Sequence, residues 1–160
     1  MPVKIRSAVL ADVPALLTID RESVSAAHWT NEQYEQRVSE ASVLVAEEEG
    51  EEENDVCGFV CTRVVADQWE IENIVVAETK RRRGVADALL QDVLSGARDH
   101  AATSVWLEVR ESNDPARRLY EKYSFRESGR RRGYYQNPLE DAVLYELQLS
   151  RPQVTIKSSC

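Results

Sequence analysis

One stretch of the sequence, from Glu70 to Ala101, restricts the possible folds of this chain more than any other. It contains a β-branched apolar run at 71–76, a basic turn that ends in Gly84, and then apolar residues at helical spacing. The run predicts a buried strand, and the spacing predicts an amphipathic helix. A strand followed directly by a helix usually returns to a parallel neighbour, so the stretch predicts a sheet with a crossover helix.

The turn before this helix predicts an anion-binding site. The first amide groups of a helix have no intrahelical partner and carry about half a positive charge, and a glycine allows the backbone to approach a ligand closely. Gly84 stands at this point, directly after Arg81, Arg82 and Arg83. The combination favours a diphosphate as the bound group, and the alternative is a solvated basic helix start.

The remaining sequence extends this stretch to an α/β fold. We expect strands at 4–8, 42–46, 56–65, 69–76, 104–109, 125–135 and 142–149, and helices after Asp12, Thr30, Gly84 and Asp114. Thr30 and Gln33 form a capping-box pattern, and Pro115 suits the first position of a helix that Asp114 caps. The order β-α-α-β-β-β-α-β-α-β-β predicts a mixed sheet with helices on both faces.

The predicted strand at 69–76 is irregular. The alternation of polar and apolar residues breaks at Asn73, because the next three residues, Ile74, Val75 and Val76, are all apolar. We expect a bulge or a fully buried segment at this point. Either feature would splay the strand from a neighbour in the central sheet.

Length and composition predict a single domain at 1–150 and a flexible tail at 151–160, because 160 residues that are 42% hydrophobic can bury one core. No run approaches the ~18 apolar residues of a membrane span, and the N-terminus lacks an apolar signal region. We therefore expect a cytoplasmic protein without a membrane partner.

The net charge of −8 is concentrated in one segment, because seven acidic residues fall within 47–55. The rest of the chain is close to neutral, so the charge does not predict a nucleic-acid partner. We expect this segment to be a solvated loop, and the alternative is a loop that binds another protein.

Three cysteines are too few for a disulfide framework. Cys57 and Cys61 are expected on the same face of one strand, and Cys160 ends the tail. Two buried thiols and one exposed thiol are the expected state, and no metal site is predicted.

Several ordered motifs resemble the GNAT superfamily of N-acetyltransferases, and within it the RimI-like branch, which modifies the α-amine of ribosomal and other proteins. The turn Arg81-x-x-Gly84-x-Ala86 is similar to the acetyl-CoA pyrophosphate motif, commonly Q/R-x-x-G-x-G/A. The further matches are 107–110 with 112–113 to the LEVR-x-SN signature, 119–125 to LYE-x-x-GF, and 132–135 to R-x-YY.

Two residues depart from the family pattern. Ala86 replaces the more usual glycine, which is tolerable because alanine is small and compatible with a helix start. Ser124 stands where the family has a glycine, and a left-handed backbone there would cost roughly 1 kcal/mol. Neither departure predicts a loss of activity.

The resemblance implies direct transfer of an acetyl group from acetyl-CoA to an amine. Glu108 takes the position of the general base, which acts through a water, and Tyr120 takes that of the general acid for the leaving sulfur. Without the resemblance, Glu108 would be interpreted as a salt-bridged strand carboxylate and Tyr120 as a core aromatic. Glu72 is the alternative base, since carboxylates of this strand serve that role in other branches.

The resemblance also implies which residues bind the two substrates. For acetyl-CoA they are Ile74, Val75, Val76, Arg81, Arg82, Arg83, Gly84, Val85, Ala86, Asp87 and Asn113. For the acceptor they are Trp29, Tyr134 and Tyr135.

The expected acceptor is a protein or peptide N-terminus, with a ribosomal protein as one candidate. The alternatives are an acetyltransferase of small amines or lysine side chains, and a non-catalytic acyl-CoA-binding module. Glu108 with Tyr120 argues against the silent module, and the adjacent tyrosines Tyr134 and Tyr135 favour a peptide over a small amine.

Overall fold

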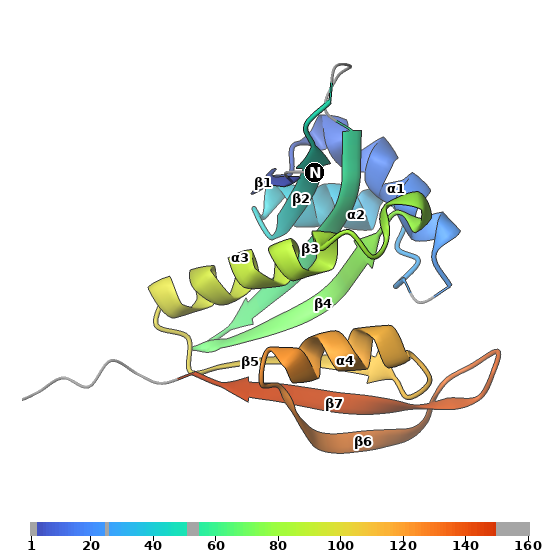
Figure 1. The fold of residues 1–160 in the computed structure, drawn as a ribbon, viewed down its shortest axis with the longest axis vertical. Helices are drawn as coiled ribbons and strands as arrows, with labels where there is room; N and C mark the ends of the chain where they lie inside the picture. The colour runs from blue at the N-terminus through green and yellow to red at the C-terminus, as the bar shows by residue number, and fades with distance from the viewer. Residues whose placement is uncertain (1–2, 25, 51–54, 150–160) are drawn as a thin grey trace, which may run out of the picture.

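The centre of the molecule is one seven-stranded mixed sheet with the strand order β1-β2-β3-β4-β5-β7-β6 (Figure 1). The computed structural model describes residues 3–24, 26–50 and 55–149. Within these ranges only β4 and β5 pair in parallel. The strands are β1 (Val3–Ser7), β2 (Val43–Glu48), β3 (Asp55–Val65), β4 (Gln68–Val76), β5 (Ser104–Arg110), β6 (Arg126–Tyr135) and β7 (Glu140–Gln148).

Helices cover both faces of the sheet, as predicted. They are α1 (Val13–Glu22), α2 (Asn31–Ser39), α3 (Val85–Asp99) and α4 (Asp114–Lys122), with short 3-10 turns η1 (Leu10–Asp12) and η2 (Glu78–Lys80). One buried cluster joins the sheet to α3 and α4, and a second joins it to α1 and α2. The predicted mixed α/β fold and its element order are therefore confirmed (Figure 1).

The sheet splays in its centre, as the irregular strand predicted. β4 pairs with β5 only from Gln68 to Ile71, opposite Ser104 to Leu107. Beyond that point β4 continues beside β3 and β5 continues beside β7. Glu72 has no partner in the pairing of β3 with β4, so the strand forms a β-bulge there. This bulge bends β4 away from β5. A cleft opens between the two separated strand ends.

Two predicted helix caps differ from the structure in position or in hydrogen bonding. Asn113, and not Asp114, is the N-cap of α4, and its side chain accepts a hydrogen bond from the Ala116 amide at 3.3 Å. Both residue types cap well, so sequence alone does not choose between them. Asp12 is the N-cap residue of α1, as predicted, but its side chain makes no capping hydrogen bond, because its carboxylate accepts from the Val9 amide and pairs with Arg6. The Thr30 capping box is confirmed.

The acidic segment is not wholly a solvated loop, so that prediction was wrong in part. Glu47 and Glu48 lie at the end of β2 and are buried, and Asp55 begins β3. The structure describes residues 49 and 50 as exposed, and 51–54 lie outside the described residues. Glu47 is compensated by Arg6, and Glu48 by Lys80 and Arg83, which makes burial of two carboxylates possible.

The two strand cysteines lie on opposite faces of the sheet, which corrects the predicted common face. Cys57 is the extra residue of a bulge between β2 and β3, and it packs in the cluster under α3. Cys61 packs in the cluster under α1 and α2. The bulge reverses the alternation between them. Both are buried free thiols, as predicted.

The expected C-terminal tail at 151–160 and Cys160 lie outside the described residues, and a single domain over 1–150 stays a prediction. Ser124 has a φ of +71°, so the residue that replaces the family glycine does adopt the left-handed backbone. No helix within the described ranges is both long and apolar enough to cross a lipid bilayer.

Candidate active site

The cleft between β4 and β5 contains two pockets that meet. Their volumes are about 360 and 460 Å³, both within the range of small-molecule sites. Both are lined by Ile74, Asn113, Ala116 and Tyr120, so the two pockets lie side by side. We name the half beside α3 the basic side, after Lys80, Arg81 and Arg82, and the other half the acidic side, after Glu70, Glu72 and Glu108.

The basic side is the N-terminus of α3. Gly84 is the N-cap with φ +80°, a backbone conformation that favours glycine. No described heavy atom lies within 4 Å of a Cβ placed on Gly84, so the space in front of the helix is open. The predicted cofactor residues that line this side are Ile74, Val75, Val76, Arg81, Arg82, Gly84, Val85, Ala86, Asp87 and Asn113.

One predicted cofactor residue lies elsewhere. Arg83 does not line the cleft, because its guanidinium turns toward Glu48 of β2 at 3.4 Å. Lys80 also pairs with Glu48, and this hydrogen bond holds the pKa of the Glu48 carboxyl below its usual range. Through Glu48, β2 thus holds the turn that precedes α3 on the side away from the cleft.

Asp87, in the first turn of α3, is neutralised by α4. Its carboxylate accepts hydrogen bonds from Lys122 at 2.6 Å and from the Tyr123 hydroxyl at 3.1 Å. These bonds, the one from Lys122 above all, lower the Asp87 pKa. The carboxylate therefore adds little repulsion to an anion at the helix start.

The exposed edge of β4 offers free backbone groups to the cleft. The Ala77 amide donates to the Cys57 carbonyl at 2.8 Å, so Ala77 forms a hydrogen-bonded pair with Cys57 of β3. Because such pairs alternate along antiparallel strands, the backbone groups of Ile74 and Val76 point to the opposite edge, toward the cleft. Arg81 reaches the Val76 carbonyl from that edge at 3.3 Å.

The acidic side contains three carboxylates, each paired with an arginine from a different element. The pairs are Glu108 with Arg131 of β6 at 2.9 Å, Glu72 with Arg37 of α2 at 3.3 Å, and Glu70 with Arg63 of β3 at 2.9 Å. Burial raises the Glu70 pKa, and the charges of the other two carboxylates add to this rise, while Arg63 opposes it. Glu108, for which two interpretations were open, is therefore both salt-bridged and in the cleft.

Tyr120 lies where the two sides meet. It is 3% exposed and packs against the rings of Phe125 and Tyr145, so it is a core aromatic as well as a cleft residue. Burial raises the pKa of its hydroxyl, with a smaller contribution from Tyr135. No hydrogen bond of this hydroxyl is found among the described residues.

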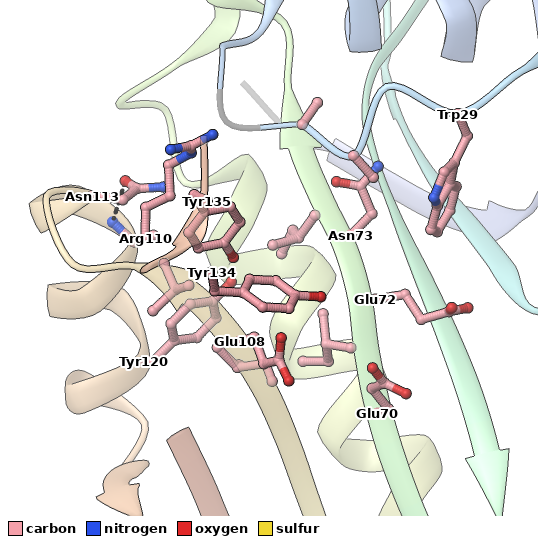
Figure 2. A pocket seen from close by; sticks show the side chains of 17 residues that line it. Trp29, Glu70, Glu72, Asn73, Glu108, Arg110, Asn113, Tyr120, Tyr134 and Tyr135 are labelled. Carbon is pink, nitrogen blue, oxygen red and sulfur yellow. Dashed lines mark hydrogen bonds between the residues drawn. The ribbon is translucent and has the colours of Figure 1, made fainter. Parts of the chain in front are cut away.

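Aromatic residues form the outer walls of the acidic side (Figure 2). Trp29, in the loop between α1 and α2, stands across the cleft from Tyr134 and Tyr135, which end β6. The Tyr135 ring is covered by the Arg110 guanidinium at 4.2 Å, and Tyr134 is 52% exposed. All three predicted acceptor residues are thus brought together around the carboxylates.

A buried polar network that the sequence reasoning missed holds the Trp29 wall. Asp20 accepts hydrogen bonds from the backbone amides of His28 and Trp29 and from the Tyr34 hydroxyl. That hydroxyl accepts in turn from Asn73, which lines the cleft. The sequence contained a signal for this network. Asp20 falls on the apolar face of a predicted helix, and a charge buried there requires hydrogen-bond partners.

Comparison with known proteins identifies the family. The sequence profile of the acetyltransferase (GNAT) family matches residues 12–125. The chain therefore belongs to this family, which confirms the predicted fold family and enzyme class, an N-acetyltransferase.

Individual relatives agree with the RimI-like branch. The [ribosomal protein bS18]-alanine N-acetyltransferase of Escherichia coli (strain K12) is 36% identical over 97 residues, which are 59% of this chain and 66% of that protein. An N-alpha-acetyltransferase of Sulfurisphaera tokodaii is 34% identical over an alignment that covers 88% of this chain and 90% of that protein. The crystal structure of the ribosomal-protein-S18-alanine N-acetyltransferase from Escherichia coli superposes with a TM-score of 0.82 at 28% identity, over 97% of this chain and 99% of that one.

Proposed function

We propose that this protein transfers the acetyl group of acetyl-CoA to the α-amine of a protein N-terminus. The observation that carries the proposal is the single cleft with two unlike sides, which meet at Tyr120. An anionic co-substrate fits the basic side, and a cationic amine fits the acidic side. The reacting atoms of the two substrates would then come together at the junction.

The residues of the basic side fit acetyl-CoA. The diphosphate accepts hydrogen bonds from the amides of Gly84 to Asp87, in the open space before α3. Arg81 and Arg82 add positive charge at the same place. The pantetheine arm lies along the edge of β4, where the backbone of Ile74 and the amide of Val76 can pair with its amides as a neighbouring strand would. The side-chain amide nitrogen of Asn113 can donate to the arm, since only its oxygen is used in the helix cap.

Glu108 acts as the general base. The α-amine enters as an ammonium ion, and its proton passes to the Glu108 carboxylate through a water. The neutral nitrogen then attacks the thioester carbonyl, forming the C–N bond. A backbone N–H on the free edge of β4 stabilises the oxygen that becomes negative in this step.

Tyr120 acts as the general acid. The C–S bond breaks, and the departing thiolate takes the proton of the Tyr120 hydroxyl. The attacking nitrogen loses its second proton as the amide forms, and this proton passes through water to restore the Tyr120 hydroxyl. A tyrosine hydroxyl with an ordinary pKa of ~10 is protonated at neutral pH, and burial raises the pKa of the Tyr120 hydroxyl further. Its position at the junction of the two pockets supports this role.

A peptide N-terminus fits the acidic side better than an isolated small amine does. The space is bordered by Trp29 on one wall and by Tyr134 and Tyr135 on the other, and the rim is open to solvent at Tyr134 (Figure 2). A chain can therefore place its first residue between the aromatic walls and continue outward. The relatives named for N-terminal acetylation support the same acceptor class.

The test is turnover of acetyl-CoA, measured as released thiol, with short peptides that differ in the first residue. Each peptide is supplied with a free and with a blocked N-terminus, and peptides beginning with alanine are included. We expect thiol release only with free N-termini. Equal turnover of free and blocked peptides, or turnover of small amines alone, would refute the proposed acceptor.

A further inference from the structure

Glu108 has one ion-pair partner within the described part of the chain, Arg131, and this partner reaches it from the edge of the sheet. β7 lies between β5 and β6, and Ala142 of β7 stands opposite both Arg110 and Arg131. Residues two apart share a face, so Glu108, Ala142 and Arg131 project to the same side. The small side chain of Ala142 leaves the guanidinium room to cross β7.

The three arginines of the acidic side are held to different degrees. Arg37 is 20% exposed, stacks on the Trp29 ring at 3.7 Å and donates to the Gln33 carbonyl, so it is fixed beside Glu72. Arg131 is 54% exposed, and its other described contact is the Tyr134 ring at 5.6 Å. Its guanidinium can leave the carboxylate and remain beside the ring.

The third pair is Glu70 with Arg63, and Glu70 lines the same pocket as Glu108. Glu70 stands opposite Trp106 in the part of the sheet where β4 and β5 still pair. Its partner Arg63 is 58% exposed, so this ion pair is as accessible to solvent as that of Glu108. Glu108 differs from Glu70 because it lies just beyond the last paired residues of β4 and β5, Ile71 and Leu107, and because the proposed function makes it the base.

We propose that Arg131 is a displaceable counter-ion of Glu108, which the acceptor ammonium replaces when it binds. The inference rests on the proposed function and adds a positioning residue to it. In the resting protein Arg131 compensates a carboxylate that is 16% exposed. When the acceptor arrives, its ammonium takes the same place, and the proton can then pass to a carboxylate that no guanidinium occupies.

Replacement of Arg131 by the acceptor ammonium must cost little free energy for the enzyme to work. The exposure of Arg131 keeps this cost low. Ion pairs with an exposed partner contribute little to stability, so the competition weakens acceptor binding by about two- to fivefold. Arg131 therefore sets the acceptor affinity. It does not contact the basic side, so binding of acetyl-CoA is independent of it.

The experiment compares Arg131→Gln, Arg131→Lys and, as a matched control, Arg126→Gln, an exposed arginine of the same strand. Binding of an alanine-initiated hexapeptide is measured by calorimetry with desulfo-CoA present, so that no transfer occurs. The same peptide with an acetylated N-terminus has no ammonium. Melting temperature and acetyl-CoA affinity verify that each variant is intact.

We expect Arg131→Gln to bind the free peptide about two- to fivefold more tightly than the wild type, and to bind the acetylated peptide equally. Arg131→Lys and Arg126→Gln should resemble the wild type. If the wild type acetylates the free peptide and Arg131→Gln binds it no more tightly, this inference fails and the proposed function stands. If the wild type neither binds nor acetylates it, both fail.

Discussion

The basic side of the cleft takes most of its lining from one continuous segment, 74–87, with α4 opposite, whereas the acidic side is assembled from five separate segments. In the proposed function, the basic side binds acetyl-CoA mainly through backbone groups at a helix start and at the edge of β4. The acidic side is proposed to act through side chains, each of which is held by a partner from another element. Changes on the basic side should therefore alter co-substrate binding, and changes on the acidic side should alter turnover.

The largest effect is expected at the helix start. Gly84→Glu places a side chain and a negative charge in the open space before α3, on a left-handed backbone. We expect acetyl-CoA affinity to fall by about 10³-fold or more, because clash and charge both oppose the diphosphate. Calorimetric titration with acetyl-CoA measures it.

Gly84→Ala is the control for backbone strain alone. It should cost roughly 1 kcal/mol of stability and leave most of the affinity intact, since a single methyl meets no described atom there. Retained acetyl-CoA affinity in Gly84→Glu would show that the diphosphate binds elsewhere.

On the acidic side, Glu108→Gln should lower kcat by about 10²-fold and leave acetyl-CoA affinity nearly unchanged, as expected when a general base is lost. Glu72→Gln is the matched control, because Glu72 lines the same pocket but is fixed to Arg37. Steady-state kinetics with a free peptide measure both. A larger loss in Glu72→Gln than in Glu108→Gln would transfer the role of base to Glu72.

At the junction, Tyr120→Phe should lower kcat by about ten- to a hundredfold and leave the melting temperature almost unchanged. Its hydroxyl has no described hydrogen-bond partner to lose. Tyr145→Phe is the control, because the Tyr145 hydroxyl accepts a hydrogen bond from Arg117 and donates one to Glu121. It should lower stability with kcat retained. Unchanged kcat in Tyr120→Phe would leave Tyr120 as a core aromatic only.

The smallest effect is expected for Asp87→Asn on the basic side. Because Lys122 lowers the Asp87 pKa, the folded carboxyl stabilises the protein above its unfolded pKa of ~3.9 and loses this contribution as pH falls through the lower folded value. The variant should melt at most about 4 °C below the wild type at pH 7. Melting curves from pH 7 to pH 3 should converge, and a constant difference would exclude the ion pair as the cause.

The difference between the basic and the acidic side also explains which parts of the site could be predicted from the sequence. The turn before α3 depends on local residues, so Gly84 and the arginines indicated an anion site, and the broken alternation at Asn73 indicated the splay. The partners on the acidic side are distant in sequence, as with Glu108 and Arg131, which meet across β7. Local patterns carry no information on such pairs.

Local signals also failed where two choices have nearly equal energy. Asn113 and Asp114 are adjacent and both suit an N-cap, and only tertiary packing selects Asn113. A bulge adds one residue without a distinctive pattern, so the face of Cys57 could not be derived from alternation. The burial of Glu48 required knowledge of Lys80 and Arg83, which approach from another element.

The most direct measurement uses one peptide with a free N-terminal alanine and a single internal lysine, incubated with acetyl-CoA and the protein. Fragmentation mass spectrometry then locates the added acetyl group. The proposed function predicts acetyl on the α-amine, with the lysine unmodified, and loss of the product in Glu108→Gln. Acetyl on the lysine side chain, or a product that forms equally well in Glu108→Gln, would contradict it.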